Sequence, residues 1–282
     1  MERELKFENI IKSDSYSISE EIRKLLKYID LILLFTKRNI ILRYKQTIIG
    51  PCWIILTPFI TSIVYAVIFG GVAGIGTDGV PQLLFYMISN SVWTVFSSIL
   101  TETSNTFVNN VALYGKVYFP RLCLPISTML TSFINFAINI FLFAGVYVYY
   151  LIKGTNLAPN WQIIIMPIII IEVGLMALGV GIIISSLTTR YRDLAIVVTF
   201  GVQLWMYLSP VVYPVSMTTG FAKRFIMINP MTMPMEIIRY SMFGIGSINY
   251  ISAIWSVAFT VIVIIIGLKL FGKIEKTFVD TV

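Results

Sequence analysis

The feature that most constrains this chain is a series of long apolar segments with almost no charge. A helix needs about 20 mostly apolar residues to cross the roughly 30 Å hydrocarbon layer of a membrane. Six segments meet this length, at residues 48–69, 83–104, 122–151, 163–187, 194–213 and 251–270. The chain is 57% hydrophobic and 12% charged, too apolar for one water-soluble core. We therefore predict an all-α integral membrane protein with six transmembrane helices per subunit.

The first of these segments follows directly on a basic stretch, "RYKQTIIGPCWIILTP" at residues 43–58, and contains two prolines. Proline is tolerated in transmembrane helices because neighbouring helices and Ser or Thr side chains satisfy the backbone groups that it frees. We expect Pro51 to lie near the start of the first span and Pro58 to bend it.

The positions of lysine and arginine predict the orientation of the spans. Short cytoplasmic loops retain basic residues, and seventeen of the 21 Lys and Arg residues fall on one side when both termini are inside. The others are Lys153, Lys223, Arg224 and Arg239. We therefore predict that both termini are cytoplasmic. The net charge of +7 reflects this topology and contact with anionic lipid headgroups, and no nucleic acid is expected as a partner.

Residues 1–47 are predicted to form a cytoplasmic segment ahead of the transmembrane domain, residues 48–282. The first 28 residues are charged throughout and lack the apolar core of a secretory signal. Residues 28–47 mix apolar and basic residues, a pattern typical of a helix at the membrane interface. The basic residues are Lys37, Arg38, Arg43 and Lys45. A short seventh span from residue 28 is the alternative.

The chain lacks the residues on which catalysis and nucleotide binding usually depend. It contains no histidine, the commonest metal ligand and a frequent general base. It has no G-x-x-x-x-G-K-[S/T] motif to hold nucleotide phosphates. The two cysteines, Cys52 and Cys123, form no metal-binding pattern. We predict no catalytic residue, no metal site and no cofactor in this chain.

Glu172 is the one charge inside the fourth apolar segment. A carboxyl group is costly to place in a span and usually faces a cavity or a partner helix. Three roles are open for Glu172: a structural hydrogen bond to a neighbouring helix, a direct part in substrate passage, and proton coupling.

The stretch between the fifth and sixth spans is too long for a hairpin and too apolar for a solvated loop. Its apolar pieces, 211–221 and 225–243, are broken by prolines and glycines into lengths that cannot cross a bilayer. We predict re-entrant helices that dip in from the outer face within residues 211–250. A peripheral amphipathic hairpin is the alternative.

Two cytoplasmic loops are candidates for contact with a soluble partner. In the loop at 105–121, apolar residues with helical spacing could dock into a groove of that partner. They are Phe107, Val108, Val111 and Tyr114. The loop at 188–193 carries Arg190, Arg192 and Asp193. These charges either follow the positive-inside rule or contact the partner.

The order of these features resembles a known family. An interfacial basic helix is followed by "RYKQTIIGPCWIILTP", "GKVYFPRLCLP", "RYRDL", "SPVVYPVS" and "INPM". This order is similar to that of the transmembrane subunits of ATP-binding-cassette exporters for polysaccharides such as O-antigen, capsule and teichoic acid. The similarity covers nearly the whole chain from about residue 28. No single motif is decisive, but their order and spacing together are specific.

The resemblance implies a homodimer in the bacterial inner membrane, bound to two copies of a separate cytoplasmic ATPase that holds ATP and Mg. It implies that the segment from Asn105 to Lys116 contains a coupling helix that sits in the ATPase, and that residues from Tyr213 to about Tyr250 form an outer gate. The substrate would be a lipid-linked glycan that passes through a channel between the two subunits. The basic residues of 28–47 would then attract its phosphate head.

Aromatic side chains suit sugars because their flat apolar faces accept the C–H-rich faces of pyranose rings. Five of them lie toward the outer halves of the first and fifth spans: Tyr65, Phe69, Trp205, Tyr207 and Tyr213. They are either channel contacts or the ordinary aromatic belt of a membrane protein.

Three other functions are compatible with parts of the pattern. An exporter of drugs or small lipids would share the fold. A proton-driven secondary transporter would use Glu172 and would show internal repeats, which we do not find between the halves. A membrane-embedded glycosyltransferase needs catalytic side chains on the outer side, where Asp78 and Glu236 are the acidic residues.

Overall fold

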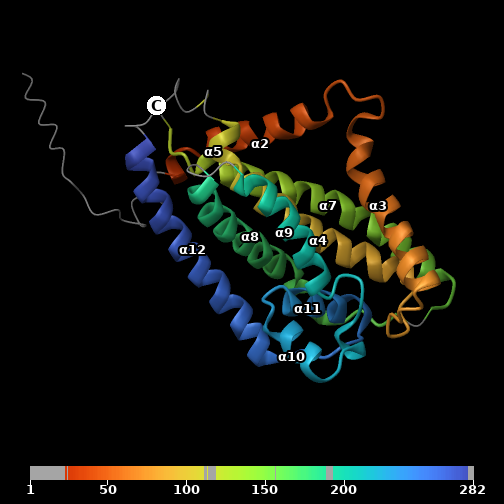
Figure 1. Ribbon diagram of the computed structural model, residues 1–282. Helices are drawn as coiled ribbons and strands as arrows, with labels where there is room; N and C mark the ends of the chain where they lie inside the picture. Colours follow the sequence, from red (N-terminus) through yellow and green to blue (C-terminus); the bar gives the residue numbers. More distant parts are fainter. Residues whose placement is uncertain are drawn as a thin grey trace, which may run out of the picture.

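The computed structural model describes residues 23, 25–110, 113, 119–155, 157–188 and 193–278, with residues 273–278 described by their backbone alone. Within this part of the chain every regular element is a helix (Figure 1). The longer helices are α2 (Ile29–Tyr44), α3 (Trp53–Tyr65), α4 (Gln82–Ser104), α7 (Cys123–Ile152), α8 (Met166–Thr188), α9 (Leu194–Leu208) and α12 (Tyr250–Phe278). The shorter ones are the 3-10 helices η1 (Gly50–Cys52), η3 (Trp161–Ile165) and η4 (Val215–Met217), the π-helix η2 (Ala66–Val72), and α5 (Thr106–Asn109), α10 (Gly220–Ile228) and α11 (Thr232–Phe243).

Five helical segments in the described residues are long and apolar enough to cross a membrane. They are Gly50–Val72, Gln82–Ser104, Cys123–Ile152, Trp161–Thr188 and Tyr250–Gly272. Each overlaps one of the predicted segments, so the all-α class and five of the six predicted spans are confirmed by length and composition. Pro51 lies in the 3-10 turn that begins the first span, and Pro58 lies inside α3.

The fifth predicted segment, 194–213, is helical only over Leu194–Leu208, and the predicted boundary at 213 is wrong. The chain leaves the helix at Ser209, whose backbone is extended. Proline disfavours the helical conformation of the residue before it, and Pro210 also lacks an N–H. The amide of Asn229 donates to the carbonyl oxygen of Leu208 at this end (3.0 Å). The helix is therefore shorter than a simple span requires.

Helix α4 forms the centre of the bundle. Its fully buried side chains include Tyr86 and Phe96, and it packs against α3, α7, α8 and α9. α12 runs along α8 (Figure 1). Glycine allows this close approach, because a Cβ atom on Gly179 would lie 3.0 Å from the backbone nitrogen of Ile264.

The two ends of the bundle carry different elements (Figure 1). α2 and α5 lie at one end, whereas α10 and α11 lie at the other, beside the start of α12. α2 packs on α7 and buries Ile32 and Phe35. Its 16 residues are fewer than the about 20 that a simple span needs.

Candidate functional site

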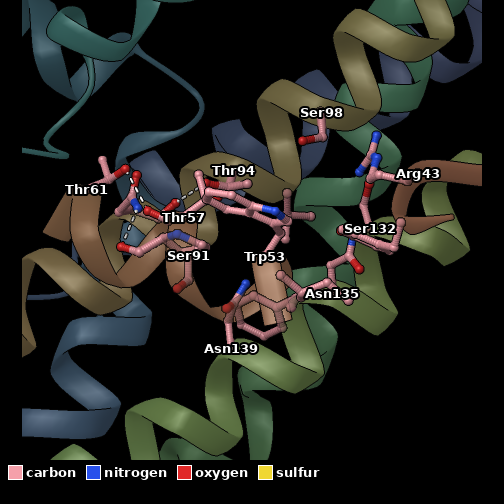
Figure 2. A pocket seen from close by; sticks show the side chains of 16 residues that line it. Arg43, Trp53, Thr57, Thr61, Ser91, Thr94, Ser98, Ser132, Asn135 and Asn139 are labelled. Carbon is pink, nitrogen blue, oxygen red and sulfur yellow. Dashed lines mark hydrogen bonds between the residues drawn. The ribbon is translucent and has the colours of Figure 1, made fainter. Parts of the chain in front are cut away.

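A polar cavity lies between α3, α4 and α7, beside the last residues of α2 (Figure 2). Its volume is about 320 Å³, which is within the range of small-ligand pockets. Figure 2 shows Arg43 near one end of the cavity and Thr61 near the other. The Ser, Thr and Asn residues that line it are Thr57, Thr61, Asn90, Ser91, Thr94, Ser98, Ser132, Asn135 and Asn139.

Each of the three helices contributes one stripe of side chains to the cavity. The lining residues are at positions 53, 54, 57, 58 and 61 in α3, at 90, 91, 94, 95 and 98 in α4, and at 132, 135, 136 and 139 in α7. Residues three or four apart share one face of a helix. The sequence prediction missed this site, although polar residues at helical spacing inside three apolar segments were its signal.

Three hydroxyl groups of the cavity have hydrogen-bond partners, whereas two amide oxygens have none among the described residues. The hydroxyls of Thr61, Ser91 and Thr94 donate to carbonyl oxygens one turn earlier in their own helices, at 2.7–2.8 Å. The Oδ1 atoms of Asn135 and Asn139 are buried and have no hydrogen-bond partner in the described part of the chain. A buried acceptor without a donor costs about 1–3 kcal/mol, so these two amides call for an explanation.

An ion pair lies at the α2 end of the cavity, where the side chain of Arg43 donates a hydrogen bond to Glu102 in the last turn of α4. Both side chains are partly exposed. Burial lowers the pKa of Arg43, but Glu102 and Tyr44 raise it, and the balance lies above the ordinary value. Arg43 is therefore a charged group whose charge is already matched.

The other basic residues predicted to attract a phosphate head lie along α2 and its end. Lys37 and Lys45 are exposed. Arg38 lies over the ring of Phe35, 4.9 Å from its centroid. The structure thus leaves the two lysines open to an anionic headgroup, whereas Arg43 faces Glu102.

Only parts of the predicted aromatic group contact each other, near the ends of α3 and α9. Tyr65 packs edge-on against Phe69 and its hydroxyl lies 3.6 Å from the sulfur of Met206. Tyr213 donates to the backbone of Tyr207 (3.2 Å), and the side chain of Tyr207 is exposed.

Trp205 differs from the other members because it points into the bundle. Its ring meets Phe96 edge-on, with centroids 4.9 Å apart. Its N–H donates to Asn229 (3.1 Å). These contacts favour a packing role for Trp205.

Of the residues predicted to contact a partner in the loop at 105–121, the structure describes Asn105, Phe107 and Val108. Phe107 is 1% exposed and stacks on Phe271 of α12, with centroids 5.1 Å apart. Docking of this ring into a partner stays a prediction, and in this structure the ring packs against the chain's own α12. Val108 is exposed, and the amide of Asn105 donates to the backbone of Thr101 (2.9 Å).

The remaining residues predicted for partner contact are placed as follows. Asp193 is exposed and directly precedes α9. Val111, Tyr114, Lys116, Arg190 and Arg192 lie outside the described residues.

Glu172 accepts a hydrogen bond from the hydroxyl of Ser256 (2.6 Å). The bond joins α8 to α12, and both residues border a mainly apolar cavity that Met233 and Pro234 of α11 also line. This hydrogen bond to a neighbouring helix is the contact expected if Glu172 has a structural role.

A buried ion pair lies within α11 at the α10–α11 end, and its arginine also contacts neighbouring segments. Arg239 donates to Glu236 (2.6 Å) and to the carbonyl oxygen of Pro210 (2.8 Å). Its guanidinium also lies 4.6 Å from the ring centroid of Phe85 in α4. Burial lowers the pKa of Arg239, and the charges of Glu236 and Asp78 oppose that shift.

Comparison with known proteins agrees with the helical architecture. A family model described as ABC-2 type transporter matches residues 30–243. The chain is 28% identical over 254 residues to an O-antigen export system permease protein RfbA of Klebsiella pneumoniae, an alignment that covers 89% of this chain and 94% of that protein. It is 26% identical over 215 residues to an RfbA permease of Myxococcus xanthus, covering 74% and 79% of the two chains. The chain therefore belongs to the ABC-2 type transporter family of multi-pass membrane proteins.

Proposed function

We propose that this chain is the permease subunit of an ATP-driven exporter that moves a lipid-linked polysaccharide from the cytoplasm to the outer face of the bacterial inner membrane. The observation that carries the proposal is the similarity to O-antigen export permeases over 89% of the chain. A polymer of the O-antigen, capsule or teichoic acid type is the substrate class. Since no closed pocket can hold such a chain, two copies of this subunit form a continuous channel.

The energy comes from two copies of a separate ATPase that binds ATP and Mg. This division of labour is supported by the absence of a phosphate-binding motif from the sequence. The ATPase binds the end of the bundle where α2 and α5 lie (Figure 1), with Val108 and the loops at 105–121 and 188–193 as its contacts. Differential binding of the ATP-bound motor to one permease conformation then shifts the population.

Phe107 has an internal role in this coupling. Its ring stacks on Phe271, so a displacement of α5 is transmitted to α12 through packed side chains. α12 in turn packs along α8. Through this contact, a movement of the ATPase is transmitted to the transmembrane helices.

Six crossings place both termini in the cytoplasm. α9 is the fifth crossing, although its 15 residues span only about 22 Å at 1.5 Å per residue. The short helices α10 and α11 at its far end make up the difference as re-entrant elements. Buried contacts of α11, including the Arg239–Glu236 pair, support this placement because backbone that is not a full span must be covered by protein.

The experiment is co-purification with the ATPase encoded beside this permease, followed by ATPase assays in lipid nanodiscs. The proposal predicts that a lipid-linked glycan stimulates hydrolysis and that a small amphiphile of matched tail length does not. Stimulation by the amphiphile alone would favour an exporter of drugs or small lipids, and transport without any ATPase would favour a proton-coupled carrier.

A further inference from the structure

The charges around the polar cavity indicate a neutral ligand. Among the described residues, Arg43 is the only charged one that lines the cavity, and its guanidinium is paired with Glu102. Glu102 already balances the charge of Arg43, so among the described residues the lining carries no unmatched positive charge that would favour an anion. The exposed lysines of α2, Lys37 and Lys45, are not among the lining residues.

The hydrogen-bonding groups of the cavity indicate a ligand that donates as well as accepts. The unpartnered Oδ1 atoms of Asn135 and Asn139 are acceptors, and Asn139 is 6% exposed. A phosphate diester has no donor, and a hydrocarbon tail has neither donor nor acceptor, so both would leave these amides unsatisfied. A hydroxyl group carries one donor and two acceptor lone pairs.

The walls also include the apolar surfaces that a sugar ring needs. Trp53 lines the cavity and is 41% exposed, and Phe136 lines it from α7. Aromatic faces accept the C–H surface of a pyranose while the hydroxyls around the ring bond to polar groups. The volume of about 320 Å³ suits a ligand of this size class.

We infer that this cavity binds one neutral, hydroxyl-rich sugar residue of the exported chain, and the inference rests on the proposed function for the source of that sugar. The site lies inside one subunit, between α3, α4 and α7. Lys45 directly follows the lining residues Arg43 and Tyr44, so the sugar site lies beside one of the exposed lysines proposed to attract the phosphate head.

The test uses the full chain in nanodiscs with two photoreactive probes that share one diazirine-bearing alkyl chain. One carries a glucose head and the other a phosphate head. After irradiation, cross-linked peptides are mapped by mass spectrometry. The glucoside should label peptides that contain residues 53–61, 90–98 and 132–139 at least about tenfold more than the phosphate does.

Two variants and one matched control define the site. Asn139→Leu and Thr57→Val should each lower cavity labelling by about tenfold, which corresponds to about 1.4 kcal/mol. Thr199→Val makes the same change on the exposed face of α9, where the hydroxyl bonds only its own helix, and should leave labelling unchanged. Equal labelling by the two heads, or wild-type labelling in both cavity variants, would overturn the inference.

The sign of the stability change separates binding from a structural role. If Asn139 serves a ligand, leucine removes a buried acceptor without a partner, and the apparent melting temperature without probe should stay or rise. A fall would assign Asn139 to structure and overturn its part in binding, with Thr57→Val left to decide the site. The probes need no ATPase and no transport. Glucoside binding in a protein that exports only small amphiphiles would therefore refute the proposed function alone.

Discussion

Replacing Arg239 with methionine should destabilise the fold by about 3–5 kcal/mol, the usual cost of leaving a buried charge without its partner. The carboxylate of Glu236 would remain buried, since the two side chains of the pair are only 5% and 8% exposed. The carbonyl oxygen of Pro210 would lose its donor at 2.8 Å, and the contact with the ring of Phe85 would be lost. The last two losses weaken the attachment of α11 to its neighbours.

The measurement is equilibrium unfolding in mixed detergent micelles, followed by tryptophan fluorescence. The double variant Glu236→Gln with Arg239→Met removes both charges and should recover about 2 kcal/mol of the loss, because it leaves mainly the oxygen of Pro210 unsatisfied, at about 1–3 kcal/mol. Arg224→Met, on the exposed part of α10, is the control and should be near wild type. A single variant within about 1 kcal/mol of wild type, or strictly additive costs in the double variant, would refute the reasoning.

Three further changes test other contacts. Gly179→Ala should lower the apparent melting temperature, because its Cβ would lie 3.0 Å from the α12 backbone. The control Gly145→Ala has nothing within 4 Å of its Cβ and should be neutral or stabilising. Equal effects of the two variants would contradict the close packing of α8 and α12. Glu172→Gln should retain export in a cellular glycan assay, because glutamine can still accept the hydrogen bond from Ser256, and near-complete loss would show that the carboxylate acts in transport. Phe107→Ala should destabilise the isolated permease by about 3–5 kcal/mol. Val108→Asp should leave the stability of the permease unchanged and weaken its co-purification with the ATPase. The reverse pattern would refute the assignment of inner and outer faces of α5.

The spans were predictable because each is a long apolar run, and five of them match helices with boundaries close to those expected. The end of α9 was predicted wrongly because the apolar run continues past Leu208, whereas Pro210 ends the helix regardless of hydropathy. At this position the backbone geometry imposed by Pro210, and not the apolar composition, decides where the helix ends. The short helices α10 and α11 were foreseeable as broken apolar pieces, but the burial of α11 was not.

The candidate site was not predictable in the same way. Its Ser, Thr and Asn residues are scattered through three apolar segments, so a hydropathy window averages them away. Only tertiary packing shows that the stripes of α3, α4 and α7 face one cavity. The pairing of Arg43 with Glu102, 59 residues apart, and the burial of Phe107 under Phe271 also depend on contacts between distant segments.

We propose that this chain conducts a polysaccharide and depends on a separate ATPase for energy. The most direct measurement reconstitutes the permease and its ATPase into vesicles with lipid-linked glycan on the ATPase side and follows glycan that becomes protected from an added glycosidase. We predict that protection requires both proteins and ATP. Protection by the permease alone, or ATP-driven movement of small amphiphiles without any movement of glycan, would contradict the account.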